Sequence, residues 1–243
     1  MIDKNSMFYW YPLIKDLDIP QPRTESYKFN EKEFHMIQDE KFPKSLFDNS
    51  LWVAKKIGFP LFMRTDHTSF KHGWKKTCYV PDEESLERHI VELLTYSMMQ
   101  GWISYTDTGL FFREFLELTT RFTAFHGEFP VNKERRYFIR NGKVQCFHPY
   151  WYPDAIESPS IKNWRERVSE INKFSPSEAT ILLEYAKMVA DVHEFHDGYW
   201  SVDFAEGTDG TWYLIDMALG DESFHWLECQ FCSDEMRKKY ENR

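Results

Sequence analysis

An Asn-Gly dipeptide places a strict limit on how this chain folds. Asn141-Gly142 lies near the middle of RRYFIRNGKVQCFHPYW, a segment that runs from Arg135 to Trp151. Tight hairpin turns need positive φ at their central residues, which Asn and Gly tolerate best, and such turns join neighbouring antiparallel strands. We therefore predict a β-hairpin here. A second hairpin is predicted over Tyr199–Ser223, where two apolar runs flank a turn of Gly and Asp.

The rest of the pattern alternates predicted helices with predicted strands. Apolar spacing and start and stop residues predict helices over residues 45–58, 81–100 and 175–196. The last of these is expected to begin with a capping box made by Ser175 and Glu178. Strands are predicted over residues 59–63, up to Val80, and over 109–118. Because hairpins dominate this order, we predict an α+β protein of two lobes with antiparallel sheets.

The chain length gives the expected division into lobes. A length of 243 residues fits one large domain or two closely packed lobes. We expect residues 1–50 to form an N-terminal segment packed on the core, residues 51–108 to form the first lobe and residues 109–243 the second.

Composition limits the classes of partner. The net charge of −9 gives no broad positive surface, so nucleic-acid binding is not expected. No apolar stretch approaches the roughly 20 residues of a membrane-spanning helix, and the N-terminus lacks a signal-peptide pattern. We therefore expect a cytoplasmic, reducing environment with no membrane partner. Since zinc would need four ligands, we interpret Cys229 and Cys232 of CQFC as two reduced thiols.

Two aspartates interrupt apolar runs in the second predicted hairpin. Asp203 lies in SVDFAEG and Asp216 lies in YLIDMALG, on strands predicted to be neighbours. Two adjacent carboxylates repel each other unless a cation lies between them. Carboxylate oxygens of this kind suit Mg²⁺, which completes its shell with phosphate and water. The alternative is that each aspartate faces solvent on the polar side of its strand.

Cationic residues recur at the ends and in the interiors of predicted strands. Arg64 ends one strand, Lys71 lies in the following loop, and Arg113 and Arg136 lie inside otherwise apolar strands. A polyphosphate needs several cations that converge from different elements, and arginine offers paired donors. Each residue could instead be a solvated surface cation. That alternative is weakest for Arg113 and Arg136, because their neighbours are apolar.

The segment FFREFLEL is a candidate binding site for a nucleotide base. A strand that links two lobes exposes a backbone edge, which can pair with adenine. A carboxylate just beyond it, Glu117, can accept hydrogen bonds from ribose hydroxyls. A plain amphipathic strand is the alternative.

The order of these segments resembles the ATP-grasp superfamily, which binds ATP between two α+β lobes. More specifically it resembles the arginine-arginine-lysine clade of phage and bacterial proteins, with the assembly chaperone of eukaryotic translation initiation factor 2 as a distant member. The resemblance rests on PLFMRTDHTSFKHGWKKTCYV, FFREFLEL, KERRYFIRNGKV, HPYWYP and WSVDFAEGTDGTWYLIDMALGD, which together run from Pro60 to Asp221.

The resemblance implies a set of ATP contacts in the first half of the chain. Arg64 and Lys71 would contact the phosphates of ATP, and Glu117 would bind the ribose. The adenine ring would be bordered by three consecutive residues, namely Glu114, Phe115 and Leu116.

The resemblance also implies the reacting end of the site. Arg113 and Arg136 would face the γ-phosphate and the acyl substrate, and Asp203 and Asp216 would hold Mg²⁺. The sequence departs from the family pattern at Ala218, where many relatives have Asn two places after the second metal-binding acid. A full two-metal site would then need help from the acidic residues that follow the strand, Asp221 or Glu222. A further departure is Arg64, where the superfamily often has lysine.

These roles imply a ligase that depends on ATP and Mg²⁺. It would form an acyl phosphate on a carboxylate and join the acyl group to an amine or another nucleophile. A peptide or protein is among the possible substrates. No general base stands out, and His148 is a candidate only because it follows the strand that carries Arg136. The alternative is an ATP-binding assembly factor with little or no ligation, which Ala218 favours. Transfer of a nucleotide or phosphoryl group to a macromolecule is a third possibility. Each of these functions requires the cations of the first half to meet Asp203 and Asp216 across one cleft.

Overall fold

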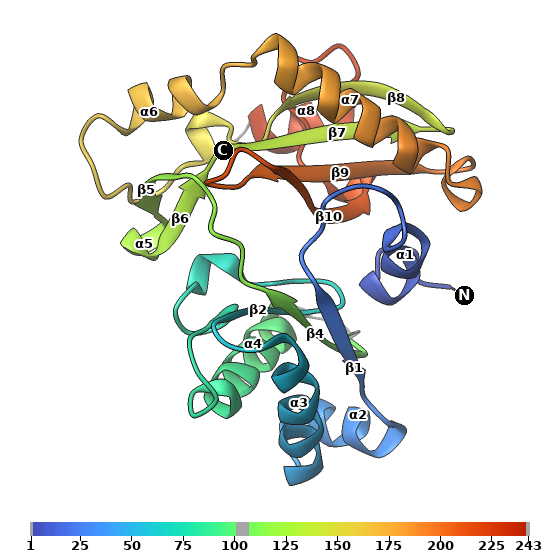
Figure 1. Ribbon diagram of the computed structural model, residues 1–243, viewed down its shortest axis with the longest axis vertical. Coiled ribbons are helices and arrows are strands. Elements are labelled where there is room, and N and C mark those ends of the chain that lie inside the picture. Colours follow the sequence, from blue (N-terminus) through green and yellow to red (C-terminus); the bar gives the residue numbers. More distant parts are fainter. Residues whose placement is uncertain (1, 101–106, 242–243) are drawn as a thin grey trace. The chain divides into compact units, whose positions relative to one another are not determined.

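The computed structural model describes residues 2–100 and 107–241. Within that range the chain divides into two compact units (Figure 1). The large unit comprises Met1–Gln21, Leu118–Phe122 and Val131–Arg243, and the small unit comprises Pro22–Glu117 and Thr123–Pro130. The lobe boundaries given above, and the packing of residues 1–50 as one segment, stay predictions.

The small unit is an antiparallel sheet with helices packed on it. Its strands pair in the order β1-β4-β2-β3, and each pair is antiparallel. The elements with their bounds are β1 (Thr24–Lys28), α2 (Glu31–Gln38), α3 (Lys44–Ile57), β2 (Leu61–Thr65), the 3-10 turn η1 (Lys71–Gly73), β3 (Tyr79–Val80), α4 (Leu86–Gln100), β4 (Gly109–Glu114) and α5 (Phe125–Glu128). β1 lies in a stretch where no strand was expected.

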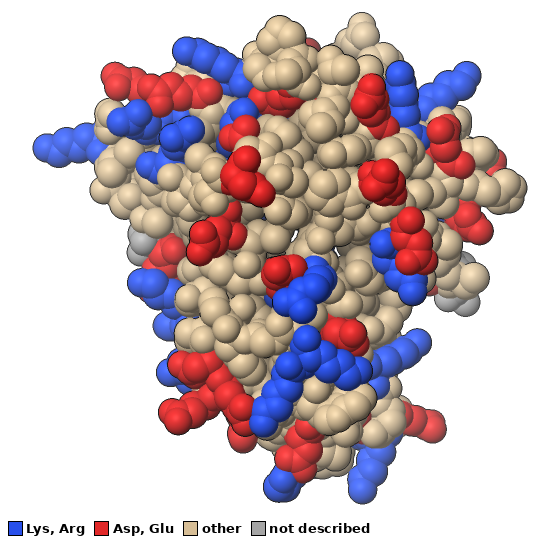
Figure 2. Space-filling view, in the orientation of Figure 1, with Lys and Arg blue, Asp and Glu red and all other residues tan. Residues whose placement is uncertain are grey.

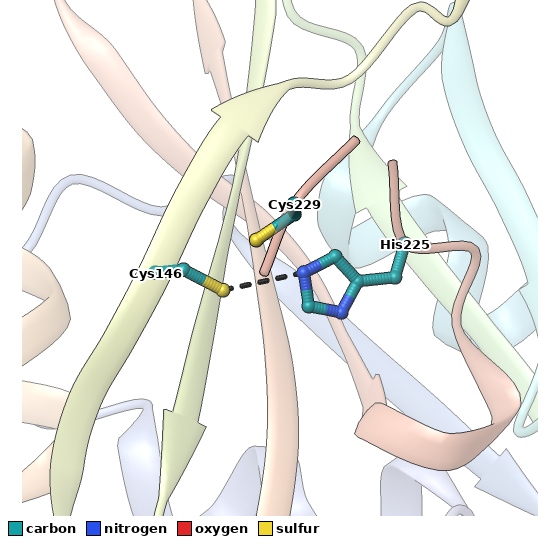
Figure 3. A group of neighbouring side chains, drawn as sticks. All are labelled: Cys146, His225 and Cys229. Atoms are coloured by element: carbon teal, nitrogen blue, oxygen red, sulfur yellow. Dashed lines mark hydrogen bonds between the residues drawn. The ribbon is translucent and has the colours of Figure 1, made fainter. Parts of the chain in front are cut away.

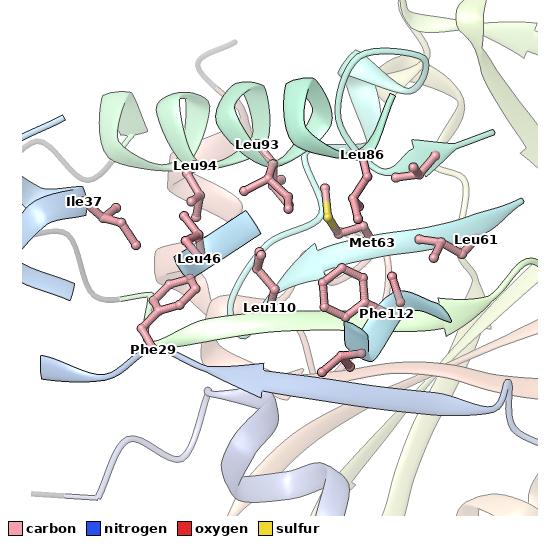
Figure 4. Close-up of a cluster of buried hydrophobic side chains, with 14 residues drawn as sticks. Phe29, Ile37, Leu46, Leu61, Met63, Leu86, Leu93, Leu94, Leu110 and Phe112 are labelled. Atoms are coloured by element: carbon pink, nitrogen blue, oxygen red, sulfur yellow. The ribbon is translucent and has the colours of Figure 1, made fainter. Parts of the chain in front are cut away.

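The core of the small unit lies between its helices and one face of its sheet (Figure 4). Leu61 and Met63 on β2 and Leu110 and Phe112 on β4 are fully buried there. Residues two apart on a strand project from the same face, so these side chains form one apolar surface. Helices α3 and α4 cover that surface with buried leucines, of which Leu46 is one. The sheet's second face is therefore left to the residues in between.

Local interactions set where two predicted elements begin and end. The predicted helix over residues 81–100 starts only at Leu86, because the Asp82 side chain accepts a hydrogen bond from the Ser85 N–H (2.9 Å) and closes a separate turn first. The predicted strand over residues 109–118 ends at Glu114, where pairing with β2 also ends at Leu61. The helix predicted over residues 45–58 is confirmed as α3.

The large unit contains the two predicted hairpins in one antiparallel sheet with the order β10-β9-β7-β8. Both hairpins are confirmed. Its elements are α1 (Met7–Ile14), β7 (Glu134–Arg140), β8 (Lys143–Pro149), the 3-10 turn η2 (Pro153–Ala155), α6 (Trp164–Ile171), α7 (Pro176–Ala190), the 3-10 turn η3 (His193–Phe195), β9 (Tyr199–Glu206), β10 (Trp212–Leu219), the 3-10 turn η4 (Gly220–Glu222) and α8 (Asp234–Glu241). A short sheet of β5 (Thr120–Ala124) and β6 (Phe129–Asn132) lies where the division between the units falls.

Helix α7 covers one face of the large sheet (Figure 1). It begins as predicted, with the Ser175 hydroxyl accepting the Glu178 N–H at 3.2 Å. The predicted capping box is wrong, because the Glu178 carboxylate does not return to the backbone of Ser175. It binds the buried guanidinium of Arg135 on β7 instead. A tertiary ion pair has therefore displaced a local cap.

The turn of the first hairpin matches the prediction. Asn141 and Gly142 have φ of 51° and 68°, which is the left-handed region that this type of turn requires. A Cβ added at Gly142 would lie 2.8 Å from Cδ2 of His196. Gly210, in the turn of the second hairpin, has φ of 82° and has nothing within 4 Å of an added Cβ.

Replacing either glycine with alanine is expected to destabilise the protein by about 1–2 kcal/mol, the cost of left-handed backbone for an L-residue. Gly142→Ala should cost roughly 0.5–1.5 kcal/mol more than Gly210→Ala, since the His196 ring must leave its rotamer. Urea unfolding of both variants measures this difference. The cost of Gly142→Ala measured in a His196→Ala background should match the cost of Gly210→Ala, and a persisting gap would mean that the His196 ring is not its cause.

Charged side chains of both signs lie interspersed on the face drawn in Figure 2. Among the residues that the structure describes, no helix combines the length and the apolar character needed to cross a membrane.

Candidate functional site

A row of polar side chains crosses the sheet of the large unit. Arg136 on β7 lies opposite His148 on β8 and opposite Asp203 on β9. Asp203 in turn lies opposite Asp216 on β10. Directly opposite residues of antiparallel strands project from the same face. His148, Arg136, Asp203 and Asp216 therefore form one row on one face.

The centre of the row is a two-point ion pair between Arg136 and Asp203. Nε and Nη2 of Arg136 donate to Oδ1 and Oδ2 of Asp203, each at 2.7 Å. The side chains are 12% and 7% exposed. Nη1 donates to the Phe224 carbonyl at 3.2 Å, and the guanidinium lies over the Tyr150 ring at 4.7 Å. Burial by itself lowers the pKa of Arg136, but the Asp203 carboxylate outweighs it and the net pKa is raised.

A bulge in β10 sets the position of Asp216. The pairing of β10 with β9 shifts between Leu214 and Asp216, so Ile215 is an extra residue, and bulges commonly redirect a neighbouring side chain. Asp216 is half-buried, and its Oδ1 accepts the Met217 N–H at 3.0 Å. Its charge also acts on Arg136 and helps to raise the pKa of that guanidinium.

The donor set of Asp203 and Asp216 fits Mg²⁺. Both offer hard carboxylate oxygens, the ligands that Mg²⁺ prefers. An ionised carboxylate has about four lone-pair positions, so Asp203 can bind the guanidinium of Arg136 and still face a cation. The two aspartates exceed the one arginine by a negative charge, which favours a cation beside them. Their assignment as metal ligands stays a prediction.

His148 is fixed in a neutral state at the end of the row. Its Nδ1 donates to the Pro149 carbonyl at 2.8 Å and its Nε2 accepts the Trp226 N–H at 3.3 Å. Burial, the largest cause, lowers the pKa of His148 to about 3, with the Arg136 charge adding to the effect. Since both ring nitrogens are engaged, the geometry argues against His148 as a general base.

The predicted phosphate-binding residues of the small unit share the face of its sheet opposite the core. Arg64 lies opposite Phe111, and Arg113 lies opposite Phe62, so alternation places both arginines away from Leu61 and Met63. Each arginine is 4% exposed. Nε of Arg64 donates to the Thr65 carbonyl (3.1 Å).

Lys71 lies in η1, where its ammonium is 5.4 Å from the centre of the Phe129 ring. The lysine therefore belongs to the loop that follows β2, as the sequence predicted. Its role toward phosphate, like those of Arg64 and Arg113, stays a prediction.

The predicted adenine segment leaves the sheet after β4. Glu114 pairs with Arg23 at 3.3 Å. The Phe115 ring packs on Tyr79, with ring centres 5.0 Å apart. Leu116 is half-buried and Glu117 is exposed. Glu117 is also the last residue of the small unit before the chain enters the large one.

A second ion-pair group, which the sequence pattern did not reveal, lies on the large unit. Arg135 is 0% exposed and its Nε donates to the Glu178 carboxylate, while Nη2 donates to the Lys173 carbonyl at 2.9 Å. Lys133 binds Glu178 at 2.7 Å and Glu206 at 3.0 Å. Lys133, Lys173, Glu178 and Glu206 line part of a cavity of about 320 Å³. Adjacent residues on a strand face opposite sides, so Arg135 could have been assigned to the face opposite Arg136.

A group of possible metal ligands on the small unit is already satisfied by protein donors. Asp66, His67 and Asp107 bring their ligand atoms close together. Asp66 accepts from Thr108 N–H (2.8 Å) and hydroxyl (2.9 Å). Asp107 binds Nδ1 of His67 at 3.0 Å and accepts from the Ser97 hydroxyl. We interpret this group as a buried polar network.

The structure thus brings together Arg136, Asp203 and Asp216, and separately places Arg64 and Arg113 on one sheet face. Because these sets belong to different units, their convergence across one cleft stays a prediction.

Comparison with known proteins identifies the kind of domain. Residues 44–226 match the profile of an ATP-grasp domain family, described as family 3 of the arginine-arginine-lysine clade. No curated protein matches the sequence.

Solved structures with similar folds are longer than this chain. One is an N5-carboxyaminoimidazole ribonucleotide synthetase in complex with ADP, with 11% identity and a TM-score of 0.50 over 88% of this chain and 44% of that one. Another is N5-carboxyaminoimidazole synthase from Aspergillus clavatus with ADP and 5-aminoimidazole ribonucleotide, with 12% identity and a TM-score of 0.49 over 88% and 43%. The VanG D-Ala:D-Ser ligase from Enterococcus faecalis has 12% identity and a TM-score of 0.48 over 88% and 52%. The chain spans about half the length of these structures.

Proposed function

The chain belongs to family 3 of the arginine-arginine-lysine clade of ATP-grasp domains, and from this premise we propose that it binds ATP with Mg²⁺ and activates a carboxylate for ligation. The predicted family and the predicted α+β ATP-grasp fold are confirmed. In the proposed reaction a substrate carboxylate takes the γ-phosphoryl group of ATP and ADP leaves. An amine or another nucleophile then attacks the acyl phosphate and releases phosphate. The observation that carries the proposal is the row of Arg136, Asp203 and Asp216.

Arg136 is the residue best placed to stabilise the anions that such a reaction brings together. A guanidinium has five N–H groups, and Asp203 and the Phe224 carbonyl accept from three of its nitrogens. The remaining N–H groups can serve a substrate carboxylate or phosphoryl oxygen. Because the ion pair fixes the guanidinium before substrate arrives, little reorganisation is needed during the reaction.

Asp203 and Asp216 would hold Mg²⁺, which when bound supplies charge neutralisation at the phosphates of ATP. Arg136 engages both oxygens of Asp203, and Oδ1 of Asp216 accepts the Met217 N–H. Asp221 and Glu222, which would replace the missing Asn at Ala218, are exposed in η4.

The small unit would supply the nucleotide contacts. We assign the ATP phosphates to Arg64 and Lys71, the γ-phosphate and acyl substrate to Arg113, and the ribose to Glu117. Adenine would be bordered by the residues that end β4 and follow it, namely Glu114, Phe115 and Leu116. After Glu114 the chain is no longer paired with β2, so the backbone groups of these following residues are outside the ladder and can meet a base. The aromatic contact of Phe115 with Tyr79 would give that binding site an apolar wall.

Mg²⁺ with ATP is expected to raise the melting temperature of the native protein, because a ligand that binds only the folded state stabilises it, by about 2.7 kcal/mol at 100 times Kd. Asp216→Ala should lose most of this increase. Asp197→Asn, an exposed aspartate of the same unit, is the control and should keep it. If neither ATP nor Mg²⁺ moves the native transition, the nucleotide assignment fails.

A second candidate function is an ATP-dependent assembly factor, which Ala218 favours because it removes a metal-ligand position found in many relatives. Hydroxylamine distinguishes the two, since it traps acyl phosphates as stable hydroxamates. The protein would be incubated with Mg²⁺, ATP, hydroxylamine and a panel of amino acids and short peptides. ADP and a hydroxamate that both depend on one carboxylate would support the ligase. Tight ATP binding without ADP formation across the panel would support the assembly factor.

A further inference from the structure

A group of sulfur and nitrogen ligands lies on the large unit, separate from the aspartates of the proposed nucleotide site. The Cys146 sulfur is 3.3 Å from Nε2 of His225. The ligand atoms of Cys146, His225 and Cys229 all lie within 4.8 Å of one another. Figure 3 shows both sulfur atoms directed toward the same side of the His225 ring.

The fold brings these residues together from two distant segments. Cys146 lies on β8 opposite Phe138, beside an irregularity in which the pairing jumps to Ile139 and Val144. His225 and Cys229 lie in the segment that follows β10 and η4. In the sequence only Cys229 and Cys232 of CQFC are close together, because local spacing cannot show that β8 lies beside this segment.

The segment after η4 is folded into two successive tight turns. The Cys229 N–H donates to the Trp226 carbonyl at 3.0 Å, and the Cys232 N–H donates to the Cys229 carbonyl at 2.9 Å. The resulting spacing is His-x-x-x-Cys-x-x-Cys, from His225 to Cys232. Ligands separated by two or three intervening residues on tight turns are typical of structural zinc sites.

The His225 ring is held with Nε2 toward the cysteines. Its Nδ1 bonds to the Tyr199 hydroxyl at 3.2 Å, and the ring stacks on Phe138 at 4.1 Å with an angle of 8° between the planes. A metal-binding histidine commonly donates its other N–H to an oxygen, which fixes the ring and its tautomer. Tyr199 is in position to serve in this way.

We propose that Cys146, His225 and Cys229 bind a zinc ion, with Cys232 as the fourth ligand. Thiolate and imidazole are the ligands that select zinc over Mg²⁺. The Cys232 sulfur, 3.8 Å from the His225 carbonyl, is not among the ligand atoms that lie within 4.8 Å of one another, so its side chain must turn to join the other three. With four protein ligands the site would be closed, and therefore structural rather than catalytic.

Charge and access are compatible with this site. On binding, each of the thiols releases its proton to solvent, and three thiolates with Zn²⁺ leave a singly negative complex. Arg237 donates to the Cys229 carbonyl at 2.7 Å, and the Arg140 guanidinium lies 3.7 Å over the Tyr199 ring, so positive charge is close by. His225 and Tyr199 also line a cavity of about 290 Å³, which offers the ion a path.

The site would fasten the segment after β10 to the edge strand β8. The residue before His225 is Phe224, whose carbonyl accepts from Arg136. The residue after it is Trp226, whose N–H donates to His148. A bound ion would therefore hold in place the backbone that supports the Arg136 guanidinium. Zinc binding at this site does not depend on the proposed ligase activity.

Metal analysis of the native protein, purified without chelator, tests the proposal. About one zinc per chain is expected, and Co²⁺ in its place should give the thiolate charge-transfer band and the visible bands of a tetrahedral site. Cys146→Ser and Cys229→Ser should lose the metal, while Cys78→Ala, in the small unit, should keep it. Tyr199→Phe should bind zinc about 10–100-fold more weakly, as expected when the partner of a metal-binding histidine is removed.

Several results would overturn the proposal. One is native protein that contains no zinc and gains none when zinc is added to the reduced form. Another is a disulfide between Cys146 and Cys229 in metal-free protein, detected by mass spectrometry after alkylation, provided that the same protein still binds no zinc once the disulfide is reduced. Equal metal content in Cys232→Ser and native protein would reject Cys232 as fourth ligand. Nucleotide binding by a zinc-free protein would leave the ligase proposal standing, so the two proposals fail independently.

Discussion

Arg136→Met is expected to lower the free energy of unfolding by about 3–5 kcal/mol, because it leaves a buried carboxylate without its counter-ion. The partner, Asp203, is 7% exposed in its side chain and accepts both of its shortest hydrogen bonds from Arg136. Loss of one member of a buried pair costs far more than the pair contributes, since the remaining charge stays desolvated. Urea unfolding followed by tryptophan fluorescence measures the change.

The double variant Arg136→Met/Asp203→Leu separates stability from function. With both charges removed, unfolding free energy should return to within about 1–2 kcal/mol of native, since apolar replacements of buried pairs are often neutral or stabilising. The response of the melting temperature to Mg²⁺ and ATP should nevertheless be lost. Any ADP formation shown by the native protein should fall by about 10²–10³-fold, the usual cost of a lost electrostatic donor. A stable double variant that still responds to nucleotide like the native protein would remove Arg136 and Asp203 from the site.

The parts of this molecule that sequence predicts well are those decided over a few neighbouring residues. The Asn141-Gly142 turn fixes the first pairs of its hairpin, Arg140 with Lys143 and Ile139 with Val144. The second hairpin makes β9 and β10 neighbours, but the bulge at Ile215, which no local pattern predicted, brings Asp216 opposite Asp203. Those aspartates were selected because each interrupts an apolar run. Arg136 was also predicted as a site residue, but its ion pair with Asp203 was not. Only the order of strands in the sheet, which places β7 beside β9, makes the two residues neighbours.

Non-local pairing explains what the sequence did not reveal. β1 pairs with β4, for example Thr24 with Arg113, and the local sequence pattern of neither segment predicts this pairing. Glu178 was assigned to a helix cap that its tertiary partner Arg135 then took over. Tertiary contacts override local preferences when they bury charge, because an unpaired buried charge costs more than a lost cap.

Arg135 provides the matched counterpart to Arg136. The two residues are adjacent on β7 and face opposite sides of the sheet, with Arg135 bound to Glu178 under α7. Burial, the largest cause, lowers the pKa of Arg135 while the charge of Glu178 opposes this shift. Arg135→Met should destabilise the protein by about 3 kcal/mol, at the low end for a broken buried pair, since Lys133 still binds Glu178 at 2.7 Å.

The double variant Arg135→Met/Glu178→Leu should recover most of this stability and, unlike the Arg136 double variant, should keep the native response to Mg²⁺ and ATP. The reason is that its charges lie on the face covered by α7, away from Asp203 and Asp216, while Lys133 retains Glu206 as a partner at 3.0 Å. Urea unfolding and nucleotide-dependent melting of the two double variants, measured side by side, make the comparison. If both double variants lose the nucleotide response, nucleotide binding does not depend on which face of the sheet loses its ion pair. The assignment of the site to the face that carries Arg136 would then have to be given up.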